Sequence, residues 1–521
     1  MGTSQFSDNQ SSTGTASQFP GRSFPVPWMI GIVALLVLSR LPLLGHILTW
    51  DEAWNLGALR SLAEGNSLFI ERYRVHPPLY MWLGLLLAPA APGLALRVEL
   101  FNLVLNAGAL LVFIRLVASL FGRQTALYTG LAYLLLPGPL FFDTWIKRDP
   151  LITLFCLLAV ACFFARRDGA AGLLLGLAML TKETAVFYWG TVFLLVLVLR
   201  RGPGKWRALL KIFSVAIIVS GWWYITAPGW QENLHYFMGT TKFTRGHEGP
   251  WWYYFAKLRS DLGWVGLALM LAGLVAAVAR PAKGKQGVEL QRFRRSRYLP
   301  FFLLFPAYLV ISFSHGKPAW ITMVLQPPLA LLVGLGWAAM ARILLSAGKS
   351  SGGNTPPRFL IAVVFLVLLL GLPLAGFRYD DYLKQVSPNQ YRVIETSSEI
   401  VAAVNAEVRD GERLLILPML YRNNPAYPDP IFYESLRVSP EILRSMNLAL
   451  DYRTLVSLVI SKRVHWVLMS PFEGSTQEAL VRGLAGDIPE AARRGRMFSV
   501  GGLFRVDTLW KGGGTGEGNA E

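Results

Sequence analysis

Long apolar segments recur along most of this chain and restrict it to a fold within a lipid bilayer. They cover residues 28–48, 96–120, 125–142, 151–165, 170–180, 185–199, 208–228, 262–279, 299–314, 319–341 and 359–376. A full crossing takes about 20 apolar residues, and several segments fall short of that length, so their ends are approximate. The chain is 53% hydrophobic and only 16% charged, which is too little charge for a soluble protein of this size. The sequence predicts a polytopic α-helical membrane protein.

The basic residues set the orientation of the predicted crossings. The formal net charge is +18, and most Lys and Arg fall in short loops between apolar segments. Such loops favour the cytoplasmic side of a membrane, where they meet anionic lipids, so we expect membrane lipids as partners and no nucleic acid. The segment Leu79–Ala88 is too short to span and is predicted to be an interfacial helix. If this segment is not counted as a crossing, the basic loops all face the cytoplasm. The chain then crosses the membrane about eleven times, and its N-terminus is cytoplasmic.

Composition divides the chain into four predicted parts. A polar N-terminal stretch is expected to be a disordered cytoplasmic tail, and the apolar region after it is the transmembrane domain. The C-terminal region has no apolar span and is predicted to be a small extracytoplasmic α/β domain with a flexible tail. The bounds are 1–24 for the first tail, 25–378 for the transmembrane domain with outer loops at 49–95 and 229–261, 379–511 for the α/β domain, and 512–521 for the last tail.

Short strand-like runs support the α/β assignment of the C-terminal region. They lie at residues 413–418, 464–469 and 503–509, and helical patterns occur between them at 391–408 and 475–484. In this topology the region lies outside the membrane, where it can cover the catalytic mouth, select an acceptor or stabilise the outer loops.

Polar residues gather on the outer side of this topology. Lys182 interrupts a short apolar stretch that begins and ends in basic, cytoplasmic sequence, so the chain rises and returns there with its apex in a protein-lined cavity. Each outer residue alone is explained equally well as an interfacial anchor or a helix cap. Together they predict a shared outer pocket formed by Asp51, Glu52, His76, Asp149, Lys182, His315 and Lys317.

Carboxylates and lysines in one pocket favour group transfer from a phosphate. One carboxylate can take a proton from an acceptor hydroxyl while the other orients the acceptor or the developing charge. Lysines stabilise the negative charge that grows on a phosphate leaving group. Asp51, Glu52, His76 and Asp149 are also compatible with a divalent cation, but lysines can neutralise a phosphate without metal. No cofactor is assigned.

The motifs around these residues resemble those of the GT-C superfamily of lipid-linked-sugar glycosyltransferases. The branch in question contains the aminoarabinose transferases of lipid A and the protein O-mannosyltransferases. The motifs stand in the expected order and comprise Asp51-Glu52, His76-Pro77-Pro78-Leu79-Tyr80, Lys147-Arg148-Asp149-Pro150-Leu151, Leu180-Thr181-Lys182, an outer-loop run from His235 to Tyr254 containing His247-Glu248, Ser314-His315-Gly316-Lys317, and Leu325 to Leu332.

The resemblance implies a function and roles for these residues. The donor is expected to be a sugar on polyprenyl or dolichyl phosphate, and the acceptor a hydroxyl of a cell-envelope glycan, lipid or protein. Transfer of the hexosyl or pentosyl group takes place at the extracytoplasmic face of the plasma or inner membrane, usually with inversion. Asp51 is implied to be the leading catalytic carboxylate and Asp149 the second, although the residues alone do not rank the two. The implied substrate-binding residues are Glu52, His76, Lys182, His247, Glu248, His315 and Lys317.

Two departures from this family narrow the expected acceptor. His76 stands where the aminoarabinose transferases carry Lys, and Glu248 where they carry a basic residue. Each lost charged contact weakens recognition of a phosphorylated substrate by ~1–3 kcal/mol, which argues against lipid A. The main alternative is a transporter or flippase of the lipid-linked substrate. Such proteins place charges at the midplane between related halves, whereas the charges here favour one face.

Overall fold

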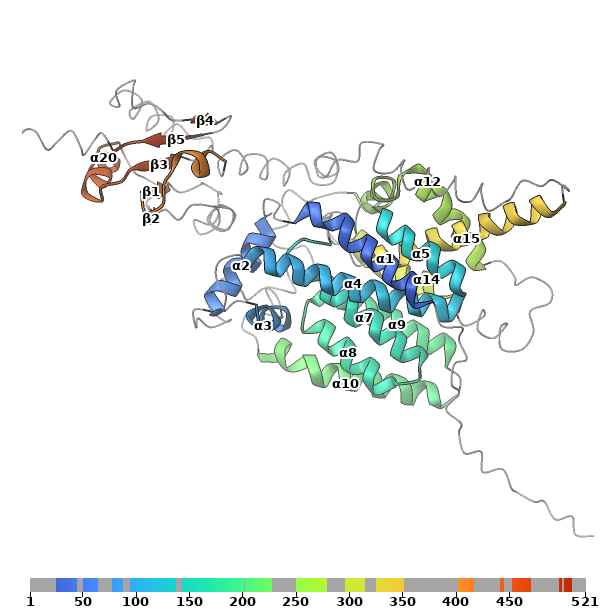
Figure 1. The fold of residues 1–521 in the computed structure, drawn as a ribbon. Helices are drawn as coiled ribbons and strands as arrows, with labels where there is room; N and C mark the ends of the chain where they lie inside the picture. The colour runs from blue at the N-terminus through green and yellow to red at the C-terminus, as the bar shows by residue number, and fades with distance from the viewer. Residues whose placement is uncertain are drawn as a thin grey trace, which may run out of the picture.

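The structure is a computed structural model of the 521-residue chain. It describes residues 25–44, 50–63, 77–87, 94–136, 143–200, 202–226, 250–278, 296–313, 325–350, 402–416, 441–444, 452–469, 496–498 and 501–507. A bundle of helices accounts for most of this part of the chain (Figure 1).

The predicted apolar segments before residue 350 all overlap helices. The helices are α1 (Val26–Arg40), α4 (Leu94–Phe121), α5 (Arg123–Leu135), α7 (Asp149–Phe164), α8 (Asp168–Met179), α9 (Val186–Leu199), α10 (Gly204–Thr226), α12 (Tyr253–Val278), α14 (Leu299–Phe313) and α15 (Gln326–Ser350). Two further helices, α2 (Trp50–Ala63) and α3 (Leu79–Leu85), and the short 3-10 turns η1 (Leu41–Leu43) and η2 (Glu183–Ala185) connect them. The predicted segment 359–376 lies outside the described residues.

Length and composition make several of these helices suitable for a bilayer. In the described part of the chain, three are long and apolar enough to cross: Leu94–Phe121, Gly204–Thr226 and Asp261–Val278. Shorter apolar helices of 10–17 residues accompany them at Val26–Arg40, Asp149–Phe164, Asp168–Met179, Glu183–Leu199 and Leu299–Leu309. The total of about eleven crossings stays a prediction. Helix α3 has seven residues and rises only about 10 Å, so it is too short to cross a bilayer, as predicted, and its place at the membrane interface stays a prediction.

Glycines allow the helices of the bundle to approach closely. Helix α15 packs against both α12 and α5, and α8 packs against α7 and α10. A Cβ atom on Gly336 would collide with the carbonyl oxygen of Leu269, and one on Gly273 would collide with that of Leu332. Backbone-to-backbone contact of this kind is typical of helices that associate in membranes, where small residues form the interface.

A larger side chain at the contact between α12 and α15 is expected to destabilise the bundle. Gly336→Ala places a methyl group where the backbone of α12 lies, so the two helices must separate, at a cost of about 1–3 kcal/mol in unfolding free energy. Gly31→Ala is the matched control, because no atom lies within 4 Å of the position its Cβ would take. Unfolding of the two variants in detergent micelles should show a loss for Gly336→Ala alone, and equal stability would contradict the close packing.

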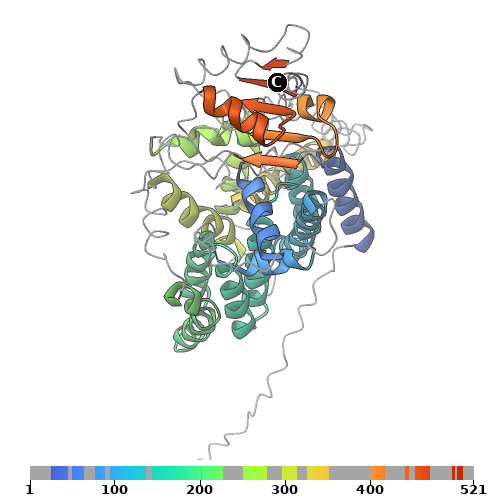
Figure 2. The same cartoon turned by 90° about the vertical axis from the view of Figure 1, so that its left-hand side faces the viewer.

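A mixed β-sheet forms in the C-terminal region, and Figures 1 and 2 show it near the end of the bundle that carries α2. Its strands follow the order β2-β1-β3-β5-β4, with β1 parallel to β2 and β3, and β5 antiparallel to β3 and β4. Strands β1, β3 and β5 confirm the three strand-like runs. The bounds are β1 Arg413–Ile416, β2 Glu441–Arg444, β3 Trp466–Met469, β4 Arg496–Phe498 and β5 Gly501–Arg505, with helix α20 at Tyr452–Ser461.

Candidate active site

Asp149 and Lys182 form a largely buried ion pair between the start of α7 and the end of α8. Asp149 is the first residue of α7, where the positive end of the helix dipole stabilises a carboxylate. Lys182 has extended backbone in the break between α8 and η2, as expected for a chain that rises and returns. Its Nζ donates to Asp149 Oδ1 at 3.2 Å and Oδ2 at 3.1 Å, and the two side chains are 13% and 2% exposed. A negative and a positive candidate residue are thus in direct contact.

The start of α2 lies against the residues that lead to Asp149. We call these residues, 143–148, the approach segment. Glu52 Oε1 accepts a hydrogen bond from the Ile146 backbone N–H at 2.8 Å, and Asn55 Nδ2 donates to the Ile146 carbonyl at 2.7 Å. Glu52 is fully buried, which favours a positioning role over direct contact with a substrate. Asp51 lies in the first turn of the same helix, but its side chain lies outside the described part of the structure.

Polar residues on α4 bind the other side of the approach segment. Asn102 Nδ2 donates to the Trp145 carbonyl and, at 3.2 Å, to the Lys147 carbonyl. Asn106 Nδ2 donates to the Asp143 carbonyl at 2.7 Å, and Glu99 is buried on the same helix face. Our sequence reasoning missed these residues. Their signal was present, because three polar side chains at positions i, i+3 and i+7 share one face of a largely apolar helix.

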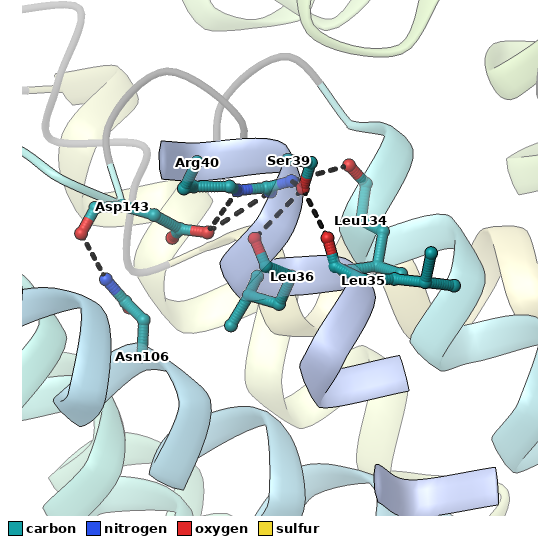
Figure 3. A network of polar contacts seen from close by, with 7 residues as sticks. All are labelled: Leu35, Leu36, Ser39, Arg40, Asn106, Leu134 and Asp143. Carbon is teal, nitrogen blue, oxygen red and sulfur yellow. Dashed lines mark hydrogen bonds and ion pairs between the residues drawn. The ribbon is translucent and has the colours of Figure 1, made fainter. Parts of the chain in front are cut away.

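An arginine at the end of α1 holds the beginning of the approach segment (Figure 3). Arg40 is fully buried, and its Nε and Nη2 each lie 3.2 Å from Asp143 Oδ2. Its Nη1 bonds Ser39 Oγ at 2.7 Å and the Leu134 carbonyl at 3.3 Å. Burial raises the pKa of the Asp143 carboxyl to about 7, and Arg40 opposes that shift. Sequence reasoning also missed this pair, whose members stand 103 positions apart.

The short helix α3 is hydrogen-bonded to the chain just before Lys182 and to Asn102 on α4. The Leu79 backbone N–H donates to the Leu180 carbonyl at 2.9 Å, two residues before Lys182. Tyr80 donates its hydroxyl to Asn102 Oδ1 at 3.1 Å. Burial raises the pKa of the Tyr80 hydroxyl, so it stays a neutral donor, and the charges of Arg148, Glu52 and Asp149 also act on it. The Tyr80 hydroxyl is therefore close to the charged side chains of Glu52 on α2 and Asp149 on α7.

The structure places Asp149 and Lys182 in direct contact and Glu52 against Ile146, three residues before Asp149, and the shared pocket stays a prediction. The remaining predicted residues lie outside the described part of the chain: His76, His247, Glu248, His315 and Lys317. Among the described residues, no three His, Cys, Asp or Glu side chains are grouped so that they can hold a metal ion. Chemically, the described site offers a carboxylate for proton transfer or orientation and an ammonium group for an anionic substrate.

Known proteins resemble this chain in both sequence and fold. No protein-family model matches it. The undecaprenyl phosphate-alpha-4-amino-4-deoxy-L-arabinose arabinosyl transferase 2 of Pseudomonas fluorescens is 29% identical over 262 residues, covering 45% of this chain and 44% of that protein. The corresponding transferase of Yersinia enterocolitica is 26% identical over 300 residues, covering 52% and 51%. The matched region thus spans about half the length of these curated relatives.

The fold comparison extends over nearly the whole chain. The crystal structure of ArnT from Cupriavidus metallidurans bound to undecaprenyl phosphate superposes with a TM-score of 0.57 at 18% identity, covering 93% of this chain and 99% of that one. Its apo form gives a TM-score of 0.55. These findings confirm the resemblance predicted from the motifs: the chain is similar in sequence to aminoarabinose transferases over about half its length, and it shares the fold of ArnT.

Proposed function

We propose that this protein is a membrane glycosyltransferase that moves a sugar from a polyprenyl-phosphate donor to a hydroxyl of a cell-envelope glycan, lipid or protein. The observation that carries the proposal is the buried contact between Asp149 and Lys182. The relatives' names supply the donor class, because they are transferases of an undecaprenyl-phosphate-linked sugar and one neighbour binds undecaprenyl phosphate. A buried carboxylate beside an ammonium group is the chemistry that such a donor requires.

In the proposed reaction, the acceptor oxygen forms a bond to the anomeric carbon as the bond from that carbon to the phosphate oxygen breaks. The bonding electrons leave with the polyprenyl phosphate, and the acceptor proton passes to a carboxylate. Asp51 and Asp149 are the two candidates for this base, and the other orients the acceptor or the developing charge. Attack opposite the leaving phosphate inverts the anomeric centre.

Lys182 has two anionic partners in this scheme. Without donor its ammonium group contacts the Asp149 carboxylate. When a donor phosphate binds, we expect the ammonium group to turn toward it, because the phosphodiester carries one negative charge and gains a second as its bond to the sugar breaks. Donor binding then leaves the Asp149 carboxylate available to the acceptor. Lys317, which sequence analysis proposed as a second phosphate contact, is the other candidate cation.

The outer face of the membrane is part of the proposal. The basic loops favour a cytoplasmic location for the other end of the bundle. Helix α2 contacts the approach segment, and Lys182 contacts Asp149 directly after that segment. The C-terminal sheet lies near the end of the bundle that carries α2 (Figures 1 and 2). We therefore place the active site and the C-terminal region on the extracytoplasmic side of the plasma or inner membrane. A C-terminal region at the catalytic end is well placed to help select the acceptor.

A transfer assay with a Lys182 variant tests the proposed function. Purified protein in nanodiscs is incubated with a panel of undecaprenyl-phosphate sugars and envelope acceptors, and products are identified by mass spectrometry. Lys182→Met should raise the donor KM about 10–100-fold, the value of one or two charge-assisted hydrogen bonds. Lys211→Met is the control, because Lys211 is exposed and lies near Gly169 at the opposite end of α8.

Two outcomes would contradict the proposal. If the wild-type protein transfers no sugar from any donor but moves lipid-linked substrate across the bilayer, it is a transporter. If transfer occurs and Lys182→Met keeps the wild-type donor KM, Lys182 is not a phosphate contact.

A further inference from the structure

We infer that Asn102 is a positioning residue for Asp149, and that Tyr80 on α3 holds Asn102 in place. The inference rests on the proposed transfer reaction, since it concerns the alignment of a residue assigned to that reaction. The supporting observation is that the buried Asn102 amide is hydrogen-bonded to the chain just before Asp149 and to Tyr80 on α3.

Asn102 fixes the turn of the chain that delivers Asp149. The side chain is fully buried, and its amide nitrogen bonds two carbonyls that stand two residues apart, those of Trp145 and Lys147. The Lys147 backbone N–H also donates to the Trp145 carbonyl, at 2.8 Å, so the chain turns tightly between these carbonyls. Two residues later the chain reaches Asp149. A small rotation of this turn would therefore displace the carboxylate from Lys182 and from a bound acceptor.

Tyr80 gives the Asn102 amide its orientation. The Tyr80 hydroxyl donates to Asn102 Oδ1 at 3.1 Å, which directs the Nδ2 hydrogens toward the approach segment. The preceding residue, Leu79, donates its backbone N–H to the Leu180 carbonyl at 2.9 Å, two residues before Lys182. Helix α3 is thus bonded to the chain before Asp149 through Asn102 and directly to the chain before Lys182. These bonds set the position of the carboxylate relative to the ammonium group.

Asn106 provides a matched comparison within the same helix. It lies one helical turn from Asn102, is also buried, and donates to a carbonyl of the same segment, that of Asp143 at 2.7 Å. That carbonyl stands six residues before Asp149, at the far end of the approach segment. A general loosening of the segment should affect both asparagines alike. The position of the Asp149 carboxylate should depend on Asn102 more than on Asn106.

The test measures kcat and donor KM for Asn102→Ala, Asn106→Ala and Tyr80→Phe, with the undecaprenyl-phosphate sugar that the wild-type protein uses. We expect kcat to fall about 10–100-fold in Asn102→Ala with little change in KM, because a misplaced catalytic group slows the chemical step. Tyr80→Phe should lower kcat in the same way but by less, since the amide can still reach the carbonyls. Asn106→Ala should lower kcat by clearly less than Asn102→Ala does, although thermal unfolding shows a comparable loss of stability.

The outcomes separate this inference from the proposed function. If the wild-type protein transfers sugar and Asn102→Ala keeps its kcat, the inference alone is wrong. It is also wrong if Asn106→Ala lowers kcat as much as Asn102→Ala does. If Asn102→Ala does not fold, Tyr80→Phe decides, because it removes a single hydroxyl, and an unchanged kcat then overturns the inference. A wild-type protein with no transfer activity would instead disprove the proposed function.

Discussion

Asp149→Asn is expected to lower the rate of sugar transfer by about 10²–10⁴-fold, the contribution of a positioned proton-transfer group. The substitution keeps the size and shape of the side chain but removes the charge that contacts Lys182. Asparagine can neither accept the acceptor's proton nor balance the ammonium group. Initial rates with a polyprenyl-phosphate sugar measure the effect, and Asp51→Asn is expected to give a loss of the same order.

The control for this prediction is another ion-paired aspartate. Asp168 begins α8 and accepts from Arg200 Nη2 at 2.8 Å, at the opposite end of the bundle from Lys182. Asp168→Asn also removes one charge from an ion pair but leaves the catalytic end unchanged, so transfer should continue at close to the wild-type rate. Activity in Asp149→Asn equal to that of Asp168→Asn would show that Asp149 has no role in the chemistry.

Above neutral pH, where the Asp143 carboxyl with its pKa of about 7 is ionised, Arg40→Ala is expected to destabilise the protein by about 3–5 kcal/mol, because it leaves this carboxylate buried without its partner (Figure 3). Removing both groups in Arg40→Ala/Asp143→Ala should recover much of the loss, since no buried charge then remains. Unfolding in detergent with each single variant and the double variant forms a complete cycle. A double variant less stable than Arg40→Ala would contradict the explanation.

The same carboxyl gives the Arg40→Ala loss a pH dependence. Burial raises the pKa of Asp143 from 3.8 to about 7 in the folded protein, so between these values the folded state keeps a proton that the unfolded chain has released. The contribution of Asp143 to stability is therefore present at low pH, falls as pH rises to about 7, and is constant above that. Without Arg40 the pKa of Asp143 in the folded protein is higher still, so stability continues to decrease with rising pH beyond pH 7. The gap between Arg40→Ala and wild type should widen above neutral pH.

The secondary structure could largely be predicted from sequence because its signals are local. The apolar segments before residue 350 correspond to helices, the short segment at Leu79–Ala88 corresponds to α3, and three predicted strands correspond to β1, β3 and β5. Asp149 and Lys182 could also be found in this way, because a charge that interrupts or ends an apolar segment in a membrane protein marks a candidate site. Ionisable residues are costly in a bilayer, so their position in the chain already carries information about function.

The side chains that hold the site together were decided by the tertiary structure. Arg40 meets Asp143 across 103 positions, and Glu52 meets Ile146 across 94. Nothing near Glu52 in the chain distinguishes a backbone-binding carboxylate from a substrate-binding one. Periodicity shows which face of a helix is polar, as for Asn102 and Asn106, but not what that face contacts. The packing of α1, α2, α3 and α4 around one turn of chain determines those contacts, since a buried polar group is stable only where the folded backbone supplies its partner.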